Sequence, residues 1–178
     1  SITMIIPYFG YAKGDKKDEP RVSIRARVCA DCIETAGADR VITMDLHSPQ
    51  VQGFFRIPMD HLYSLPILCE VVKGMGLSEN LVVISPDAGF AKTARKYADY
   101  LGTPVAIGDK TRVAHDEKAE ILELIGNVEG KDCMIVDDFT ISGGTLADIA
   151  KVLKQKGAKR ILACLGHNML REKGVKRI

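Results

Sequence analysis

The sequence predicts an α/β protein in which mostly parallel sheets are flanked by helices. Short apolar runs rich in β-branched residues alternate along the 178 residues with longer stretches of helical pattern. Such alternation is typical of parallel strands joined by crossover helices. Polar, glycine-rich segments directly follow several of the apolar runs. In open α/β sheets ligands bind beyond this end of the strands, so these segments are the first place to look for a site.

The elements follow one another in a regular order, each strand being a short apolar run and each helix a longer one of helical pattern. The predicted strands are Ile2–Tyr8, Arg40–Asp45, Leu81–Ser85, Val105–Gly108, Cys133–Asp137 and Arg160–Leu165. The predicted helices are Val22–Ala36, Pro66–Met75, Gly89–Leu101 and Gly143–Lys156. The stretches ETAGADRVITMDLH and KQKGAKRILACLGH share one pattern, which indicates the same unit in two related domains.

A change of pattern divides the chain into two domains. The segment FFRIPMDHLYSLP contains two prolines and no clear period, and a new alternation of helices and strands follows it. We therefore expect domains at residues 1–63 and 64–178. Because the chain starts inside a predicted strand and ends abruptly, we expect the first domain to be truncated at its N-terminus.

The composition is that of a folded protein, with 46% hydrophobic and 27% charged residues. A formal charge of +2 makes no case for binding to nucleic acid or to an acidic membrane. No apolar run reaches the roughly 18 residues of a membrane span, and no signal-peptide pattern opens the chain. The five cysteines lie mostly in apolar runs, which predicts buried thiols and a cytoplasmic location. Cys29 and Cys32 form a lone C-x-x-C that we assign to core packing.

The stretch CMIVDDFTISGGTL (Cys133–Leu146) carries the strongest functional signal. An apolar strand is followed by Asp137 and Asp138, and then by Ser142, Gly143, Gly144 and Thr145 at the start of a helix. Glycines let backbone N–H groups close around a phosphate, and the helix N-terminus and two hydroxyls add donors. The carboxylates can accept hydrogen bonds from the vicinal hydroxyls of a sugar. The pattern predicts a site for a ribose phosphate.

Two other interpretations of this stretch are weaker. An acidic helix cap with a glycine-rich turn needs no ligand, but paired acids directly after a hydrophobic strand favour binding. A Walker-type loop is excluded because no Lys follows the second glycine. The stretch resembles the phosphoribosyl-diphosphate-binding motif of the type I phosphoribosyltransferase superfamily. This superfamily includes transferases that consume phosphoribosyl diphosphate and the synthetases that make it, and the motif does not choose between them.

Three further segments resemble the ribose-phosphate pyrophosphokinase family, over essentially the whole chain. The first, IPYFGYAKGDKKDEPRVSI, places a polar loop after the first strand, with cations suited to a triphosphate. Lys13 stands where the family usually has Arg, and Gly14 where it usually has Gln, so bidentate phosphate geometry and an amide contact are lost. The resemblance implies an ATP site made of Lys13, Asp15, Lys16, Lys17, Asp18 and, from the next segment, His47.

The second segment is TMDLHSPQVQGFF. Asp45 and His47 are two residues apart, so we expect them to point the same way at the end of a strand. A carboxylate and an imidazole there can hold Mg²⁺ directly or through water, and the imidazole can also contact phosphate. The resemblance implies a Mg²⁺ site with Asp45, His47 and, from the third segment, Asp87.

The third segment is VVISPDAGFAKTARKYADYLGTPVAIGDKTR. Its loop of Asp87, Ala88, Gly89 and Phe90 follows a strand and opens a helix, so it can present backbone N–H groups to a pyrophosphate. Phe90 stands where the family has a second glycine. Lys110 and Arg112 match the two cations of the family's mobile catalytic loop, which implies that they neutralise charge on the transferred group and on the leaving AMP.

The resemblance implies an in-line attack by the C1 hydroxyl of ribose 5-phosphate on the β-phosphorus of Mg-ATP, with AMP as the leaving group. Lys110, Arg112, His47 and Mg²⁺ would supply positioning and charge neutralisation rather than covalent chemistry. Ile141 replaces the third acid of the family loop, so we expect weakened binding of ribose 5-phosphate. The resemblance also implies a homo-oligomer, a dimer or a hexamer.

Two alternatives stay open at the level of sequence. A phosphoribosyltransferase would share the sugar-phosphate loop, but it would need a base-recognition hood. It would have no use for the lysine-rich loop, Lys13–Asp18. A catalytically silent regulatory homologue is favoured by the departures at Gly14, Phe90 and Ile141. Retention of the paired acids and of the cations matched to the catalytic loop argues for an active enzyme.

Overall fold

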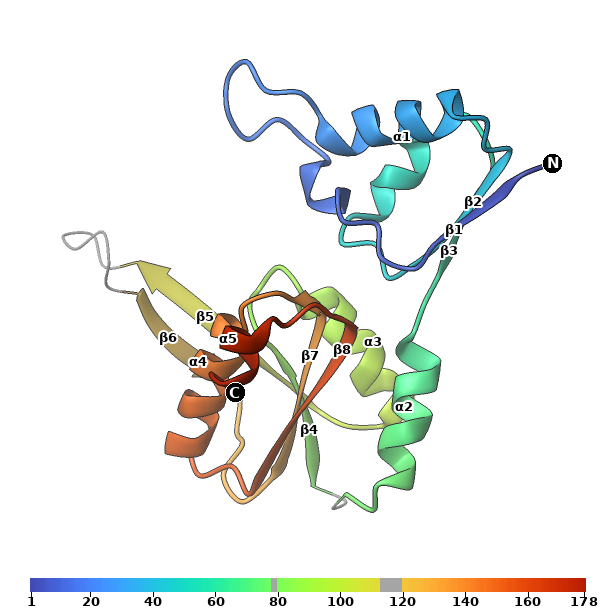
Figure 1. The fold of residues 1–178 in the computed structure, drawn as a ribbon. Helices are drawn as coiled ribbons and strands as arrows, with labels where there is room; N and C mark the ends of the chain where they lie inside the picture. Colours follow the sequence, from blue (N-terminus) through green and yellow to red (C-terminus); the bar gives the residue numbers. More distant parts are fainter. Residues whose placement is uncertain (78–79, 113–119) are drawn as a thin grey trace. The chain divides into compact units, whose positions relative to one another are not determined.

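The chain forms two compact units, Ser1–Ser64 and Leu65–Ile178 (Figure 1). The computed structural model describes residues 1–77, 80–112 and 120–178, except for the side chains of residues 110–112 and 120–122. The division falls one residue after the boundary expected from the change of sequence pattern. Both units combine mostly parallel strands with helices, so the predicted fold class is confirmed.

Unit 1 is a three-stranded parallel sheet in the order β1-β2-β3. Its elements are β1 (Thr3–Ile6), the 3-10 helix η1 (Ala12–Gly14), α1 (Arg25–Thr35), β2 (Arg40–Met44), the 3-10 helix η2 (Pro49–Phe54) and β3 (Met59–Leu62). Helix α1 buries Ala26, Ala30 and Ile33, which recur at helical spacing on one side. They pack with Val41 of the sheet and with Phe55 in one hydrophobic core.

Unit 2 is built on a five-stranded sheet in the order β6-β5-β4-β7-β8. All neighbouring strands are parallel except β5 and β6, which are antiparallel. The elements in chain order are α2 (Leu65–Gly74), β4 (Leu81–Ser85), α3 (Ala91–Leu101), β5 (Val105–Arg112), β6 (Glu120–Ile125), β7 (Asp132–Thr140), α4 (Gly144–Gln155), β8 (Arg160–Asn168) and α5 (Glu172–Val175).

Helices cover both faces of this second sheet, with α2 and α3 on one face and α4 on the other (Figure 1). Successive strand residues point to opposite faces, so Val83 and Val136 pack on the α2–α3 side, while Val82 and Ile135 pack on the α4 side. Every residue of β4 is buried. Each helix in the described part of the chain is too short or too polar to cross a bilayer.

Several elements differ from the expectation. Strands β3 and β6 and the short helix α5 were not predicted, because none of them has a clean period in the sequence. Strand β7 runs on to Thr140, so Asp137 and Asp138 lie inside the strand and not after it. The extension is stabilised by pairing with β8, where Phe139 lies opposite His167. Two polar residues at the end of an apolar run therefore do not mark reliably where a strand ends.

Candidate functional site

The turn between β7 and α4 gathers the groups expected to bind a phosphate. Gly143 has a left-handed backbone (φ 70°), and its carbonyl accepts the Ala147 N–H at 2.9 Å, which starts α4. A Cβ on Gly143 would lie 2.9 Å from Ile178 Cδ1 and 3.2 Å from the Gly174 carbonyl oxygen, so a glycine is needed here. Ser142 Oγ lies 3.4 Å from the Gly144 nitrogen. Two hydroxyls, Ser142 and Thr145, therefore flank the N-terminus of an α-helix.

Asp137 and Asp138 form a pair of adjacent carboxyl groups just before this turn. Burial raises the pKa of Asp137 to about 7, with further contributions from the charge of Asp138, from a hydrogen bond to it, and from the charge of Asp87. The two backbone amides that follow are engaged by the pair, since Asp138 N donates to Asp137 Oδ1 at 3.0 Å and Phe139 N to Asp138 Oδ1 at 2.8 Å. A carboxyl group that titrates near neutral pH can both donate and accept hydrogen bonds.

The Asp87–Phe90 loop lies at the carboxyl end of β4, which neighbours β7 in the sheet. Asp87 Oδ1 accepts the Phe90 N–H at 2.9 Å, and Ser85 Oγ donates to the Asp87 carbonyl oxygen at 2.6 Å. The Phe90 amide is therefore engaged within the loop. The Phe90 ring packs against the core on the α2–α3 side. Phe90, which stands where the family has a glycine, therefore points into the core, where its apolar side chain is stabilised by burial.

The two cations assigned to the catalytic loop lie near the end of a strand. Lys110 and Arg112 belong to β5, which continues four residues beyond the predicted end at Gly108. Their backbones pair with β6, Lys110 opposite Leu122 and Arg112 opposite Glu120. Their side chains lie outside the described residues, so their catalytic role stays a prediction.

The lysine-rich loop of unit 1 is tied to the segment that follows β2. Ser48, which is buried, places Oγ 2.6 Å from Asp15 Oδ2 and 2.8 Å from Gln50 Oε1. Lys13 belongs to η1, and the side chains of Lys13, Lys16, Lys17 and Asp18 are exposed. The two loops that the resemblance assigns to ATP are therefore neighbours in unit 1, and Ser48 is the residue that joins them. The serine was not singled out in the sequence because it carries no charge.

Asp45 and His47 do not share a strand face, which corrects the geometric argument made from their spacing. Strand β2 ends at Met44, and Asp45 has a left-handed backbone (φ 45°), so the alternation of side chains stops before it. Asp45 Oδ1 accepts the Ser64 N–H at 3.1 Å. Among the described residues, Asp45 Oδ2 is buried with no hydrogen-bond partner, whereas the His47 side chain is exposed.

His61 supports the same loop, although no sequence signal indicated it. Its Nε2 accepts the Leu46 N–H at 2.9 Å, and its ring lies 4.3 Å from that of Tyr63, centroid to centroid. Because Nε2 accepts this hydrogen bond, it carries no proton, and the imidazole is in its neutral form. His61 thus fixes the backbone between Asp45 and His47.

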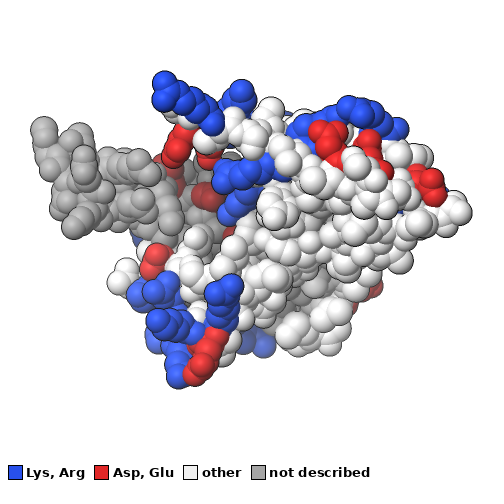
Figure 2. Space-filling model, turned by 45° about the horizontal axis from the view of Figure 1, so that its top comes forward, with Lys and Arg blue, Asp and Glu red and all other residues white. Residues whose placement is uncertain are grey.

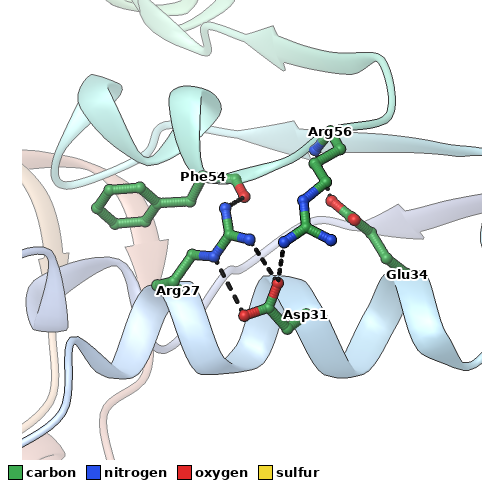
Figure 3. A network of polar contacts seen from close by, with 5 residues as sticks. All are labelled: Arg27, Asp31, Glu34, Phe54 and Arg56. Carbon is green, nitrogen blue, oxygen red and sulfur yellow. Dashed lines mark hydrogen bonds and ion pairs between the residues drawn. The ribbon is translucent and has the colours of Figure 1, made fainter.

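Helix α1 and the 3-10 helix η2 are held together by an arginine clamp (Figure 3). Arg27 donates to both oxygens of Asp31, at 3.1 Å and 2.7 Å, and from Nη1 to the Phe54 carbonyl oxygen at 2.5 Å. Arg56 approaches Asp31 at 3.8 Å, and its backbone N–H donates to Glu34 at 2.6 Å. The clamp fixes the end of the segment that begins with Asp45.

Charged side chains lie in several separate groups on the surface drawn in Figure 2. Basic and acidic side chains lie near one another in these groups (Figure 2). Within residues 1–77, 80–112 and 120–178, no three His, Cys, Asp or Glu side chains converge into a metal-binding group. A divalent cation would therefore need oxygen atoms from a substrate as well as from the protein.

Two family models match this chain. Residues 1–37 match the family described as the N-terminal domain of ribose phosphate pyrophosphokinase, and residues 75–177 match the phosphoribosyl transferase domain. A ribose-phosphate pyrophosphokinase of Chlorobaculum tepidum is 48% identical over 99% of this chain and 54% of its own length. The Bacillus subtilis protein of the same name is 46% identical over 100% of this chain and 56% of its own length.

A solved structure shows the same fold. The phosphoribosylpyrophosphate synthetase of Mycobacterium smegmatis superposes with a TM-score of 0.90 at 39% identity, over 99% of this chain and 57% of that one. The chain spans about half the length of the curated relatives that it matches. The match extends through both units and includes the β7–α4 turn. The chain therefore belongs to the ribose-phosphate pyrophosphokinase family of the phosphoribosyltransferase superfamily.

Proposed function

We propose that the protein transfers the pyrophosphoryl group of Mg-ATP to the C1 hydroxyl of ribose 5-phosphate, giving 5-phosphoribosyl 1-diphosphate and AMP. The observation that carries the proposal is the β7–α4 segment, where a pair of adjacent carboxyl groups precedes a glycine-rich helix start. The names of the relatives support the same reaction. In this reaction the C1 oxygen bonds to the β-phosphorus, the bond from that phosphorus to the α-bridging oxygen breaks, and the hydroxyl proton is released.

The sugar phosphate is assigned to unit 2. The 5-phosphate would bind Ser142, Thr145 and the backbone amides at Gly143 and Gly144, where the helix N-terminus favours negative charge. The vicinal hydroxyls of the ribose would donate to the carboxyl pair of Asp137 and Asp138. The Asp87–Phe90 loop at the neighbouring strand end would face the pyrophosphate being transferred, although the Phe90 amide already donates to Asp87.

The nucleotide is assigned mainly to unit 1. Its phosphates would meet Lys13, Lys16 and Lys17, with Asp15, Asp18 and His47 as polar neighbours in two loops that Ser48 joins. Lys110 and Arg112 would neutralise charge on the transferred group. Catalysis in this scheme is positioning together with electrostatic stabilisation, and no covalent intermediate is required.

The residues present suit Mg²⁺ held jointly with phosphate oxygens. Asp45 offers a buried carboxylate oxygen that has no hydrogen-bond partner among the described residues, and hard oxygen donors are what this ion prefers. Asp87 lies close enough to Asp137 to raise its pKa, so negative charge is crowded there. Asp45 and His47 of unit 1 would hold an ion directly or through water, and Asp87 is the carboxylate that unit 2 would offer. Bound there, it would neutralise charge on the triphosphate.

A single assay tests the proposal. The chain is incubated with ATP, Mg²⁺ and ribose 5-phosphate, and AMP is measured with the sugar phosphate present and absent. AMP that forms only when ribose 5-phosphate is present supports the proposal. AMP formation that does not depend on the sugar, or the absence of AMP under both conditions, contradicts it. A Phe139→Leu variant changes a buried residue next to the carboxyl pair and keeps both acids. It shows whether a local change of packing alone affects AMP formation.

We further propose that the protein acts as a homo-oligomer in the cytoplasm. All five cysteines are free thiols, and Cys69, Cys133 and Cys164 are buried, which suits a reducing compartment. The oligomer follows from the family resemblance. Light scattering coupled to size exclusion would measure its mass, and a monomer at micromolar concentration would contradict this part of the proposal.

A further inference from the structure

Gly14 and Arg25 are in steric contact in unit 1. Gly14 is buried, and a Cβ added to it would lie 2.8 Å from Arg25 Cβ and 3.1 Å from Arg25 Nε. Because Arg25 Cβ is attached directly to the backbone of α1, a change of rotamer cannot relieve the shorter contact. Any side chain at residue 14 would therefore displace Arg25 from its place over the loop that contains Lys13 and Asp15.

Arg25 does little to stabilise the helix that it begins. It is the first residue of α1, where the helix dipole is positive and a cation is unfavourable, and Ile24 before it makes no side-chain cap. Arg25 pairs with Asp18 at 3.3 Å, but both side chains are 57% exposed, and exposed ion pairs contribute little to stability. Stabilisation of the fold therefore does not explain why an arginine stands at position 25.

Arg25 also lines a pocket of about 340 Å³ together with Asp18, Glu19, Val22 and Ser23. That volume is in the range of small-ligand sites. The pocket borders the lysine-rich loop, because Asp18, which lines the pocket, belongs to that loop, and Gly14 of the same loop lies against Arg25. A guanidinium offers a planar fork of donors that matches two phosphate oxygens, whereas the ammonium group of a lysine is a point charge.

We infer that Arg25 binds the phosphate chain of the nucleotide beside Lys13, and that Gly14 provides the space that Arg25 needs. The inference rests on the proposed function for the identity of the ligand. It assigns to the nucleotide site a residue outside the lysine-rich loop, brought to it by the start of α1.

Calorimetric titrations of the full chain with Mg-ATP, and competition with adenosine, test this assignment. Arg25→Gln should weaken Mg-ATP binding about tenfold, because a charge-assisted contact is lost. Adenosine has no phosphate, so its affinity should change less than about twofold. The affinity of Arg25→Lys for Mg-ATP should lie between that of Arg25→Gln and that of the unaltered chain, because the charge is kept but the planar fork of donors is lost. Arg40→Gln removes another exposed arginine of unit 1 that is paired with an aspartate, and it should leave both affinities unchanged.

Gly14→Ala supplies an independent measurement, because it displaces Arg25 without changing its chemistry. It should weaken Mg-ATP binding in the unaltered chain and cause no further loss in an Arg25→Gly background, where the Cβ contact is absent. Equal losses for Mg-ATP and adenosine in Arg25→Gln, or no loss for Mg-ATP, would overturn the assignment. If the unaltered chain binds neither ligand, the proposed nucleotide site itself fails, which is a result distinct from a silent Arg25→Gln.

Discussion

Among single residues, Asp137 combines burial with a repulsive neighbour, and this has a consequence for stability. Its pKa rises from an ordinary 3.8 to about 7 in the folded protein. Between these values the folded chain holds a proton that the unfolded chain has released, so stability decreases as the pH rises from about 4 to about 7. The full penalty remains above that range, where both states are ionised.

Asp137→Asn should therefore stabilise the protein at alkaline pH, because the amide stays neutral in both states. We expect the free energy of unfolding in urea to exceed that of the unaltered chain by roughly 1–3 kcal/mol near pH 8, with a smaller difference near pH 5. The same variant should bind ribose 5-phosphate less tightly. A variant that is less stable than the unaltered chain near pH 8 would show that the buried carboxylate is satisfied by contacts other than a proton.

Ile141 is the residue-scale departure that bears most directly on the sugar phosphate. Its side chain is 53% exposed in the turn before α4 and offers no polar contact. Ile141→Asp should lower the apparent KM for ribose 5-phosphate about fivefold, since one added hydrogen bond contributes roughly 1 kcal/mol. Ile141→Leu serves as the apolar control. An unchanged or higher KM in the Asp variant would mean that the carboxylate does not reach the sugar.

At the scale of elements, the β7–α4 turn depends on a glycine for two separate reasons. Gly143 and Gly130 have nearly the same backbone angle (φ 70° and 68°), but only at Gly143 would a Cβ meet other atoms within 4 Å. Both Ala variants should lose roughly 1 kcal/mol to backbone strain, and Gly143→Ala should lose about 1–2 kcal/mol more to the contacts with Ile178 and Gly174. Urea unfolding of the two variants measures the difference, and equal losses would show that the C-terminal residues yield freely.

Elements with a regular pattern of burial along their length were the predictable ones. Strand β4 is buried at every position and was predicted with its observed bounds, and α4 was predicted to within one residue at each end. Strand β3 was missed because its sequence, MDHL, is only half buried and carries two polar residues. The extension of β7 through its carboxyl pair depends on β8, a strand distant in the sequence. Tertiary pairing of this kind leaves no local pattern.

The candidate site shows the same limit. Charged and glycine-rich motifs pointed to the loops after β1, β2, β4 and β7, because phosphate chemistry requires those residue types. They did not point to Ser48 or His61, whose roles come from contacts between segments. The spacing of Asp45 and His47 suggested a shared strand face, but the strand ends one residue too early. Residue type thus located the site, while the backbone decided how the residues are used.

For the whole molecule, the two proposed substrates are assigned to different compact units. The carboxyl pair and the glycine-rich turn belong to Leu65–Ile178, and the lysine-rich loop belongs to Ser1–Ser64. Each unit has its own hydrophobic core, so a charge change in one loop need not disturb the fold of the other unit. Binding of the two substrates should therefore respond separately to substitutions in the two units.

Lys13→Gln and Asp138→Asn form the matched pair that tests this separation. Lys13→Gln should weaken Mg-ATP binding about tenfold and leave ribose 5-phosphate binding within about twofold, and Asp138→Asn should do the reverse. Titrations of each substrate alone avoid any effect of turnover, and thermal unfolding checks that both variants fold. If either substitution weakens both substrates equally, the two half-sites are energetically coupled in the unliganded protein. Assignment of one substrate to each unit would then have to be abandoned.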